Sequence, residues 1–259
     1  MSSSPRGLVG VHYAVPRLRS EGWELSDDLM PESVLHDQAV ELLKALLAAW
    51  AARAGEGALV VRNLAVRWNE SEPRIGVDPD VCVLAPAPPG AADLRSLRTW
   101  TAGHAAPLLA IEVVSETNPH KDYAIAPDKY AASGTGELWI FDPLLAGPAA
   151  QGGPFRLQIW HRRADGDFAR VYAGDGPARS PTLDAYLVAT DEGRKLRLAA
   201  DEGATQFWLS AEESERAAKE AALAARETER AARESERAAK ELALARIAEL
   251  EAAIAARRK

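Results

Sequence analysis

The sequence contains a single cysteine, Cys82. This excludes an internal disulfide framework and any zinc site built from several cysteines. Cys82 lies within the apolar run 81–84, so we expect a small buried hydrophobic residue rather than a reactive thiol. No stretch approaches the roughly 20 apolar residues that a membrane-spanning helix needs. Residues 1–7 lack the apolar core of a signal peptide, so we expect a soluble, cytoplasmic protein with no membrane partner.

The sequence also lacks an excess of positive charge, because its net charge is −7. Residues 211–259 contain 11 acidic residues and 11 lysines and arginines, so residues 1–210 carry all of the −7. Proteins that clamp nucleic acid usually present a basic face, because phosphate contacts dominate their affinity. The charge therefore argues against tight, non-specific DNA binding by residues 1–210. A local basic cleft or a metal-bridged substrate remains compatible with it.

Several common catalytic patterns are missing. The sequence has no glycine loop of the phosphate-binding kind and no Ser-His-Asp arrangement, and His104, His120 and His161 show no metal-ligand spacing. The hydrophobic content of 47% is ordinary for a folded protein. The length suits one sizeable domain and an appendage. We expect a lead-in over residues 1–29, an α/β domain over 30–209 and a helical tail over 210–259.

Apolar periodicity predicts the order of elements in the domain. A helix over residues 122–133, closed by Gly134, lies between two apolar strands and favours a parallel β-α-β crossover. Residues 155–162 and 168–172 flank Asp165-Gly166-Asp167, a hairpin signal. The other expected elements are a helix over 33–54, a strand over 58–68 bent near Asn63, strands over 80–84, 107–114 and 137–142, and a closing α+β segment over 180–208.

The C-terminal tail is a heptad repeat. Glu-Ser-Glu-Arg-Ala-Ala-Lys at 213 returns in closely similar form at 227 and 234. Good helix formers without Gly or Pro, with Glu and Lys/Arg three and four residues apart, predict one long helix. Its possible seam is mostly alanine before Leu242, Ile247, Leu250 and Ile254, and alanine buries little area. Two interpretations stay open, a coiled coil that makes a homodimer and a solvated single helix.

Two carboxylates in apolar strands are the strongest candidates for chemistry. Asp80 begins the strand 80–84, and Glu112 lies inside the strand 107–114. A buried carboxylate is costly unless a cation or a proton compensates it. On adjacent strands the two could converge on a hard cation such as Mg²⁺ or Mn²⁺. The alternative for Glu112 is a buried ion pair with Arg62 or Arg67.

Several segments, in order, resemble a known family. They are 77–81 (Val-Asp-Pro-Asp-Val), 111–118 (Ile-Glu-Val-Val-Ser-Glu-Thr-Asn), Asp122, Tyr130 and 136–143 (Gly-Glu-Leu-Trp-Ile-Phe-Asp-Pro). This set looks like the Uma-two family of bacterial nuclease-like proteins in the PD-(D/E)XK superfamily, over about residues 30–190. The resemblance implies a restriction-endonuclease-like mixed sheet flanked by helices.

The resemblance also implies roles for residues. Asp80 and Glu112 match the two metal ligands. The family's catalytic lysine matches Ala126, four residues after Asp122 and four before Tyr130, which is a departure from the pattern. Lys129 lies three residues on, about one helical turn, and is our choice for a migrated catalytic lysine. Lys121 is the second choice.

Other residues are weaker candidates. His36 matches a histidine common in the family, with a helix-surface or capping role as the alternative. Glu32 and Glu41 could extend the acidic cluster or lie on a solvated helix face. We expect Asp122 to be a helix cap and Trp139 and Trp160 to be core aromatics.

The leading hypothesis is a metal-dependent endonuclease that hydrolyses DNA phosphodiester bonds through Asp80, Glu112 and Lys129. The rival hypothesis is an inactive nuclease-fold binding or scaffold module that oligomerises through its tail. Ala126, the acidic charge of the domain and the long helical tail motivate this rival.

Overall fold

The computed structural model describes residues 33–54 and 57–257. The expected lead-in over 1–29 and the candidate Glu32 lie outside these residues. The chain divides into two compact units, one ending at Ser210 and one beginning at Ala211. Each unit is described by itself.

A six-stranded sheet forms the centre of the first unit, with the strand order β1-β3-β5-β6-β7-β8. Strands β5 and β6 pair in parallel, while the other neighbours are antiparallel, so the sheet is mixed. Every residue of β5 and β6 is buried, as their apolar sequences require. The strands are β1 (Leu59–Val61), β3 (Val81–Leu84), β5 (Leu109–Val113), β6 (Glu137–Phe141), β7 (Leu157–Arg162) and β8 (Phe168–Gly174).

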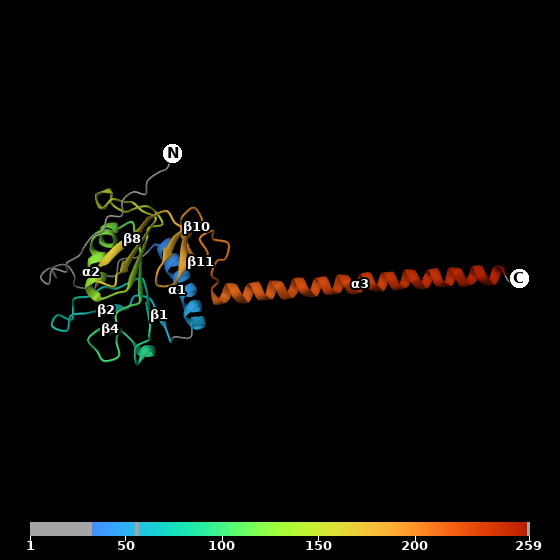
Figure 1. The fold of residues 1–259 in the computed structure, drawn as a ribbon, viewed down its shortest axis with the longest axis horizontal. Coiled ribbons are helices and arrows are strands. Elements are labelled where there is room, and N and C mark those ends of the chain that lie inside the picture. The colour runs from blue at the N-terminus through green and yellow to red at the C-terminus, as the bar shows by residue number, and fades with distance from the viewer. Residues whose placement is uncertain (1–32, 55–56, 258–259) are drawn as a thin grey trace. The chain divides into compact units, whose positions relative to one another are not determined.

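Helices cover both faces of this sheet (Figure 1). On one face, α1 (Val34–Ala54) buries Leu43 and Leu47 against strand residues that include Val83 and Trp139. On the other face, a π-helix η2 (Lys121–Ile125) runs into α2 (Ala126–Ser133), and Tyr130 packs with Ala110 and Ile140. Gly134 ends α2 in the left-handed conformation at φ 83°, which glycine adopts without strain. The predicted crossover between two parallel strands is confirmed.

Smaller elements complete the unit and correct two expectations. The single strand expected over 58–68 is two strands, broken where Asn63 adopts φ 48°. The segment 180–208, expected to be α+β, contains strands and no helix. A three-stranded antiparallel sheet packs its apolar residues into the cluster beneath α1. The remaining elements are β2 (Ala65–Arg67), β4 (Ser96–Arg98), β9 (Ala178–Ser180), β10 (Ala185–Thr190), β11 (Lys195–Ala199), η1 (Ala91–Asp93) and η3 (Ala149–Gln151).

Cys82 is fully buried on the β3 strand, and burial raises the pKa of its thiol to about 12. The thiol therefore stays protonated near neutral pH, as expected for an inert core residue.

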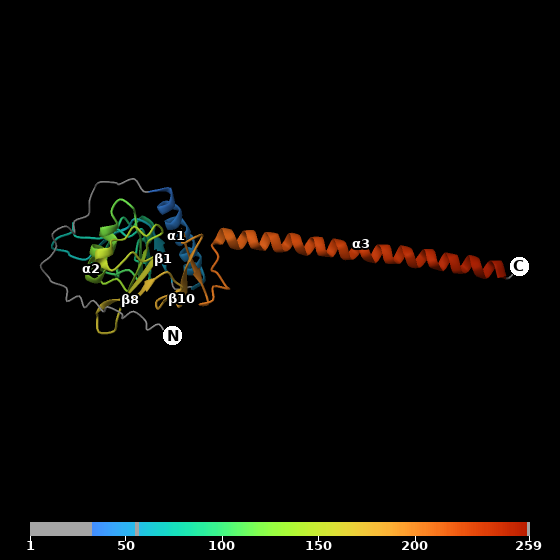
Figure 2. The same ribbon diagram turned by 90° about the horizontal axis from the view of Figure 1, so that it is seen from above.

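The second unit is one continuous helix, α3 (Ala211–Arg257), of 47 residues (Figure 2). At about 1.5 Å per residue its length is about 70 Å, and the prediction of one continuous helix is confirmed. Its leucines are exposed, with Leu242 at 75%. Ion pairs along the helix include Arg216–Glu212, Arg230–Glu234 and Arg233–Glu229. No helix within the described ranges is long and apolar enough to cross a bilayer.

Deleting residues 211–259 is expected to leave the first unit folded, because both buried clusters consist of residues before Ser210. The measurement is thermal unfolding followed by near-ultraviolet circular dichroism, which reports on the tryptophans of the first unit. The midpoint temperature of unfolding should shift by less than about 4 °C, which corresponds to a change of less than about 1 kcal/mol in the free energy of unfolding. Loss of cooperative unfolding on truncation would mean that the boundary lies elsewhere.

Candidate active site

Asp80, directly before β3, and Glu112, on the neighbouring strand β5, lie at the same end of this strand pair. Strands β3 and β5 pair antiparallel with Val81 opposite Ile111, and one more step of this register places Asp80 opposite Glu112. Directly opposed residues point to the same face, with Cβ atoms about 4.5–5.5 Å apart. The backbone N–H of Val113 donates a 2.7 Å hydrogen bond to Oδ2 of Asp80 and holds this carboxylate against β5. The expectation that the two strands are adjacent is therefore confirmed.

Glu112 is almost fully buried, at 1% exposure, and its partners come from η2 and α2. The Tyr130 hydroxyl donates a 2.6 Å hydrogen bond to Oε1, and Nζ of Lys121 lies 3.8 Å from Oε2. The alternative of an arginine partner is wrong. Arg62 pairs with carboxylates of α1, and Arg67 bonds a serine and a backbone carbonyl.

The electrostatics of Glu112 follow from this burial. Burial is the main cause that raises the pKa of Glu112 to about 7, and the negative charge of Asp80 acts in the same direction. The ammonium of Lys121 and the Tyr130 hydrogen bond act in the opposite direction and favour the carboxylate. A nearby cation is therefore the natural way to hold Glu112 ionised at neutral pH.

Lys121 bridges two buried carboxylates, because its Nζ also lies 3.8 Å from Oδ1 of Asp122. Its side chain remains 47% exposed, so the ammonium lies between the buried acids and solvent. Glu112, first, and Asp122 raise the pKa of Lys121, while burial opposes them. Burial and the charge of Glu112 raise the pKa of Asp122 well above its usual value. Asp122 lies inside the π-helix, whose N-cap is His120, so the expected capping role of Asp122 is wrong.

Lys129 lies on α2, and burial and the nearby charge of Lys121 lower the pKa of its ammonium. The charge of Glu112 acts in the opposite direction, which places Lys129 within electrostatic range of the site. Within the described ranges Lys129 makes no ion pair, whereas Lys121 makes two. The role of Lys129 stays a prediction. Ala126, at the position expected for the lysine, is buried in the apolar cluster with Tyr130.

His36 reaches the site from the first turn of α1. Its Nε2 lies 3.2 Å from Oδ2 of Asp80, and the side chain is buried. The helix-surface or capping alternative for His36 is therefore wrong. The hydroxyl of Ser33 instead accepts a hydrogen bond from the backbone N–H of His36 in the first turn of α1. Glu41 instead binds Arg62 on the exposed side of α1. Trp139 and Trp160 are buried core aromatics, as expected.

The side chains around Asp80 and Glu112 can be compared with the ligands that a divalent cation requires. No group of three or more His, Cys, Asp or Glu side chains is placed to hold a metal ion in the part of the chain that the structure describes. This argues against a closed, all-protein cage. Mg²⁺, however, commonly binds through one or two carboxylates and keeps several waters. Val113 and His36 both contact Oδ2 of Asp80 and hold this carboxylate in place. Asp80 and Glu112 therefore fit an open magnesium-type site.

Another buried carboxylate, that of Glu137, was not predicted from the sequence. It is fully buried at the start of β6. It accepts hydrogen bonds from Trp139 Nε1 (2.5 Å), the Ser180 hydroxyl (2.6 Å) and the Thr182 N–H (2.9 Å), and Nδ1 of His161 lies 3.3 Å away. Burial alone would raise the pKa of Glu137, but these donors outweigh it and lower the pKa. A carboxylate saturated by protein donors joins β6 to the β9 region and leaves no place for a substrate.

Comparisons with known proteins place the chain in a family. The chain matches no curated protein. It resembles a crystal structure titled as a "putative nuclease belonging to DUF820" from Anabaena variabilis ATCC 29413, with 14% identity and a TM-score of 0.40 over 60% of this chain and 76% of that one. Residues 23–154, just over half of the chain, match the Uma2 family model, described as "Putative restriction endonuclease". This span includes Asp80, Glu112, Lys121 and Lys129, and the chain belongs to the Uma2 family of restriction-endonuclease-like proteins.

Proposed function

We propose that this chain is a divalent-metal-dependent endonuclease that hydrolyses phosphodiester bonds of DNA. The observation that carries the proposal is the pair formed by Asp80 and Glu112 on adjacent strands, with an ammonium 3.8 Å from Glu112. Membership of the Uma2 family supports the same activity.

Each residue of the site then has a task. Asp80 and Glu112 hold Mg²⁺ or Mn²⁺, and the ion, when bound, lowers the pKa of a coordinated water and stabilises charge on the scissile phosphate. His36 and the Val113 N–H fix the orientation of Asp80. The Tyr130 hydroxyl fixes the orientation of Glu112. A lysine orients the attacking water as an ammonium or, as the neutral amine, accepts a proton from it.

Two lysines compete for that last task. The sequence pattern favours Lys129, through its distance of one helical turn from Ala126. The 3.8 Å contact with Glu112 and the exposed approach to solvent favour Lys121. We propose that Lys121 orients the water and that Lys129 adds positive charge behind it.

Replacing each lysine by methionine should separate these roles. We expect Lys121→Met to lower kcat for DNA cleavage by about 10²-fold or more, the range of losses when one preorganised donor is removed from an active site. Lys129→Met should have less than about a tenth of that effect on kcat, because Lys129 makes no ion pair with the site carboxylates in the described chain. Single-turnover cleavage rates measure both. A larger loss in Lys129→Met would return the role to Lys129.

The activity itself is tested with supercoiled plasmid. The wild-type chain should nick or cleave the plasmid with Mg²⁺ or Mn²⁺ and should be inactive in EDTA. If the folded chain, assayed with Mg²⁺ or Mn²⁺, leaves both plasmid and single-stranded DNA intact, the result favours the rival proposal of an inactive nuclease-fold scaffold. Ala126 in place of the family's lysine is the observation behind that rival.

We also propose a cytoplasmic chain that self-associates through α3, most simply as a homodimer. The support is the exposed apolar group Leu242, Leu244, Ile247 and Leu250 near one end of the helix. Light scattering of the full chain and of a chain ending at Ser210 decides this. Equal numbers of subunits in both would show that α3 does not drive assembly.

A further inference from the structure

Asp122 is a buried carboxylate to which the proposed mechanism gives no task. The residue lies in the π-helix η2 and is 3% exposed. Its Oδ1 is shielded from solvent and has no hydrogen-bond partner among the residues that the structure describes. A buried carboxylate is costly unless a cation or a proton compensates it. Nζ of Lys121, which lies 3.8 Å from this Oδ1, is the cation that the structure provides.

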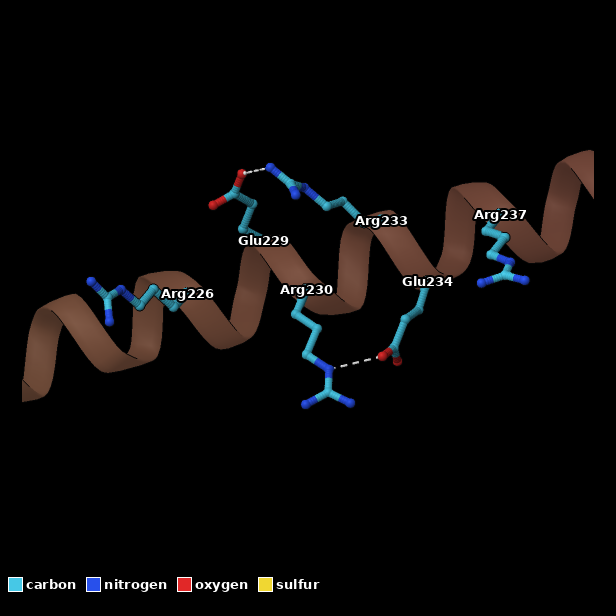
Figure 3. Close-up of a pocket in the computed structure, with 6 residues that line it drawn as sticks. All are labelled: Arg226, Glu229, Arg230, Arg233, Glu234 and Arg237. Carbon is cyan, nitrogen blue, oxygen red and sulfur yellow. Dashed lines mark hydrogen bonds and ion pairs between the residues drawn. The ribbon is translucent and has the colours of Figure 1, made fainter.

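The ion pairs of α3 give a measure of how much a charge contact matters. Figure 3 shows Arg230 paired with Glu234 and Arg233 paired with Glu229 along this helix. The four side chains are between 63% and 81% exposed, and such pairs contribute little and are screened by salt. The two carboxylates that contact Lys121 are only 1% and 5% exposed, so their attraction for its ammonium is screened much less.

Two carboxylates from different elements fix the place of the Lys121 ammonium. Nζ lies 3.8 Å from Oε2 of Glu112 on β5 and 3.8 Å from Oδ1 of Asp122 on η2. A lysine side chain has a flexible four-carbon stem, so a single contact would leave the ammonium free to swing about Glu112. The second contact restricts that motion. Because the lysine side chain remains 47% exposed, water and substrate can still reach it.

The fold fixes Asp122 through its neighbour Tyr123, the other buried residue of η2. The Tyr123 hydroxyl donates a 2.9 Å hydrogen bond to Oδ2 of Asp142 and accepts one of 2.9 Å from the backbone N–H of Phe155. Gly147 leaves room for the tyrosine ring, because a Cβ at this position would collide with it. The anchored turn therefore holds the backbone of Asp122 in place beside Lys121.

The geometry argues against a third metal ligand at Asp122. Among the described residues, no three His, Cys, Asp or Glu side chains are placed to hold one ion. We propose that Asp122 is a positioning residue, which holds the Lys121 ammonium beside Glu112 so that it orients the attacking water. This rests on the proposed nuclease function, and Asp122 acts only through Lys121.

The kinetic test is a double-mutant cycle of single-turnover cleavage rates with Mg²⁺. Asp122→Asn should lower the rate by about 10-fold or more, since a small displacement of a positioned group is costly. In the Lys121→Met chain the same change should alter the rate by less than about twofold, because the ammonium that Asp122 positions is already gone. Glu116→Gln removes an exposed acid from the loop between β5 and η2 and should keep the wild-type rate.

Titration calorimetry with Mn²⁺ separates positioning from metal binding. Asp122→Asn should change the Mn²⁺ affinity by less than about 10-fold, whereas Glu112→Gln, which loses a ligand, should lower it by about 10²-fold or more. Asparagine has the shape of the protonated acid that burial favours at Asp122, so the variant should fold. Near-ultraviolet circular dichroism checks the fold, and Asp122→Ser is a second variant with the same expected results.

Urea unfolding in EDTA tests the ion pair without metal or DNA. Asp122→Asn should lower the midpoint more in the wild-type chain than in the Lys121→Met chain, because only the wild-type chain contains the pair. The two shifts should differ by at least about 0.2 M urea.

Three results would overturn the proposal. They are wild-type cleavage by Asp122→Asn, equal rate losses from this change with and without Lys121, and a loss of Mn²⁺ affinity as large as that of Glu112→Gln. If the wild-type chain cleaves no DNA, the nuclease function fails, and the urea cycle then decides about the pair alone. Equal midpoint shifts in both chains would remove the Asp122–Lys121 pair as well, and unequal shifts would leave it standing.

Discussion

Changing Glu112 to glutamine is expected to lower the rate of metal-dependent DNA cleavage by at least about 10³-fold, because a metal ligand and its charge are lost together. Asp80→Asn should act similarly, and the double variant should lose little more, since groups that act as a unit are not additive. Initial rates of plasmid nicking at saturating Mg²⁺ measure the effect.

The same substitution should leave the fold intact. Glutamine keeps an oxygen that can accept from Tyr130, and it resembles the protonated acid that burial already favours at Glu112. Glu112→Gln should therefore unfold at the same temperature as the wild type or a higher one. Glu202→Gln, at an exposed position, is the matched control and should retain full activity. Wild-type cleavage by Glu112→Gln would remove this site from the mechanism.

The largest expected effect on stability is at Glu137. Changing Glu137 to alanine leaves two buried donors, on Trp139 and Ser180, and the half-buried N–H of Thr182 without their acceptor. Each unsatisfied buried donor costs about 1–3 kcal/mol. We therefore expect the free energy of unfolding to fall by about 3 kcal/mol or more in urea titrations at pH 7. Glu116→Ala, at an exposed position, should change it by less than about 0.5 kcal/mol.

This contribution should depend on pH in a defined direction. The donors lower the pKa of Glu137 below its ordinary value of 4.5. A group whose pKa is lowered by folding stabilises the folded state above its unfolded pKa, and this stability is lost as the pH falls through the folded pKa. The stability difference between wild type and Glu137→Gln should therefore be constant above about pH 5 and shrink below 4.5. A difference that grew on acidification would contradict the lowered pKa.

Local patterns were enough to predict much of the fold. The nearly continuous apolar run before Val114 predicted a central strand, and β5 is buried along its whole length. The alanine-rich repeat predicted α3, because helix propensity and charge pairing along a helix are local properties. The break near Asn63 was predicted as a bend, but the separation into two strands in different sheets was not. That separation depends on tertiary pairing, because β1 pairs with β3 and β2 pairs with β4.

The site was predictable only in part for the same reason. Asp80 and Glu112 are conspicuous because each is a charge beside or within an apolar strand. Which lysine reaches Glu112 depends on the π-helical turn that places Lys121, and residue spacing in an ordinary α-helix does not predict such a turn. Glu137 was missed because its partners, Ser180 and Thr182, are more than forty residues away.

Manganese bound in a crystal tests the central claim most directly. A crystal of the full chain soaked in Mn²⁺ should show an anomalous difference peak within about 2.0–2.6 Å of a carboxylate oxygen of both Asp80 and Glu112. The same soak of a crystal of Glu112→Gln should show no peak there. A wild-type crystal with no peak between these two carboxylates, or with manganese held only by other residues, would contradict the proposed metal-dependent nuclease site.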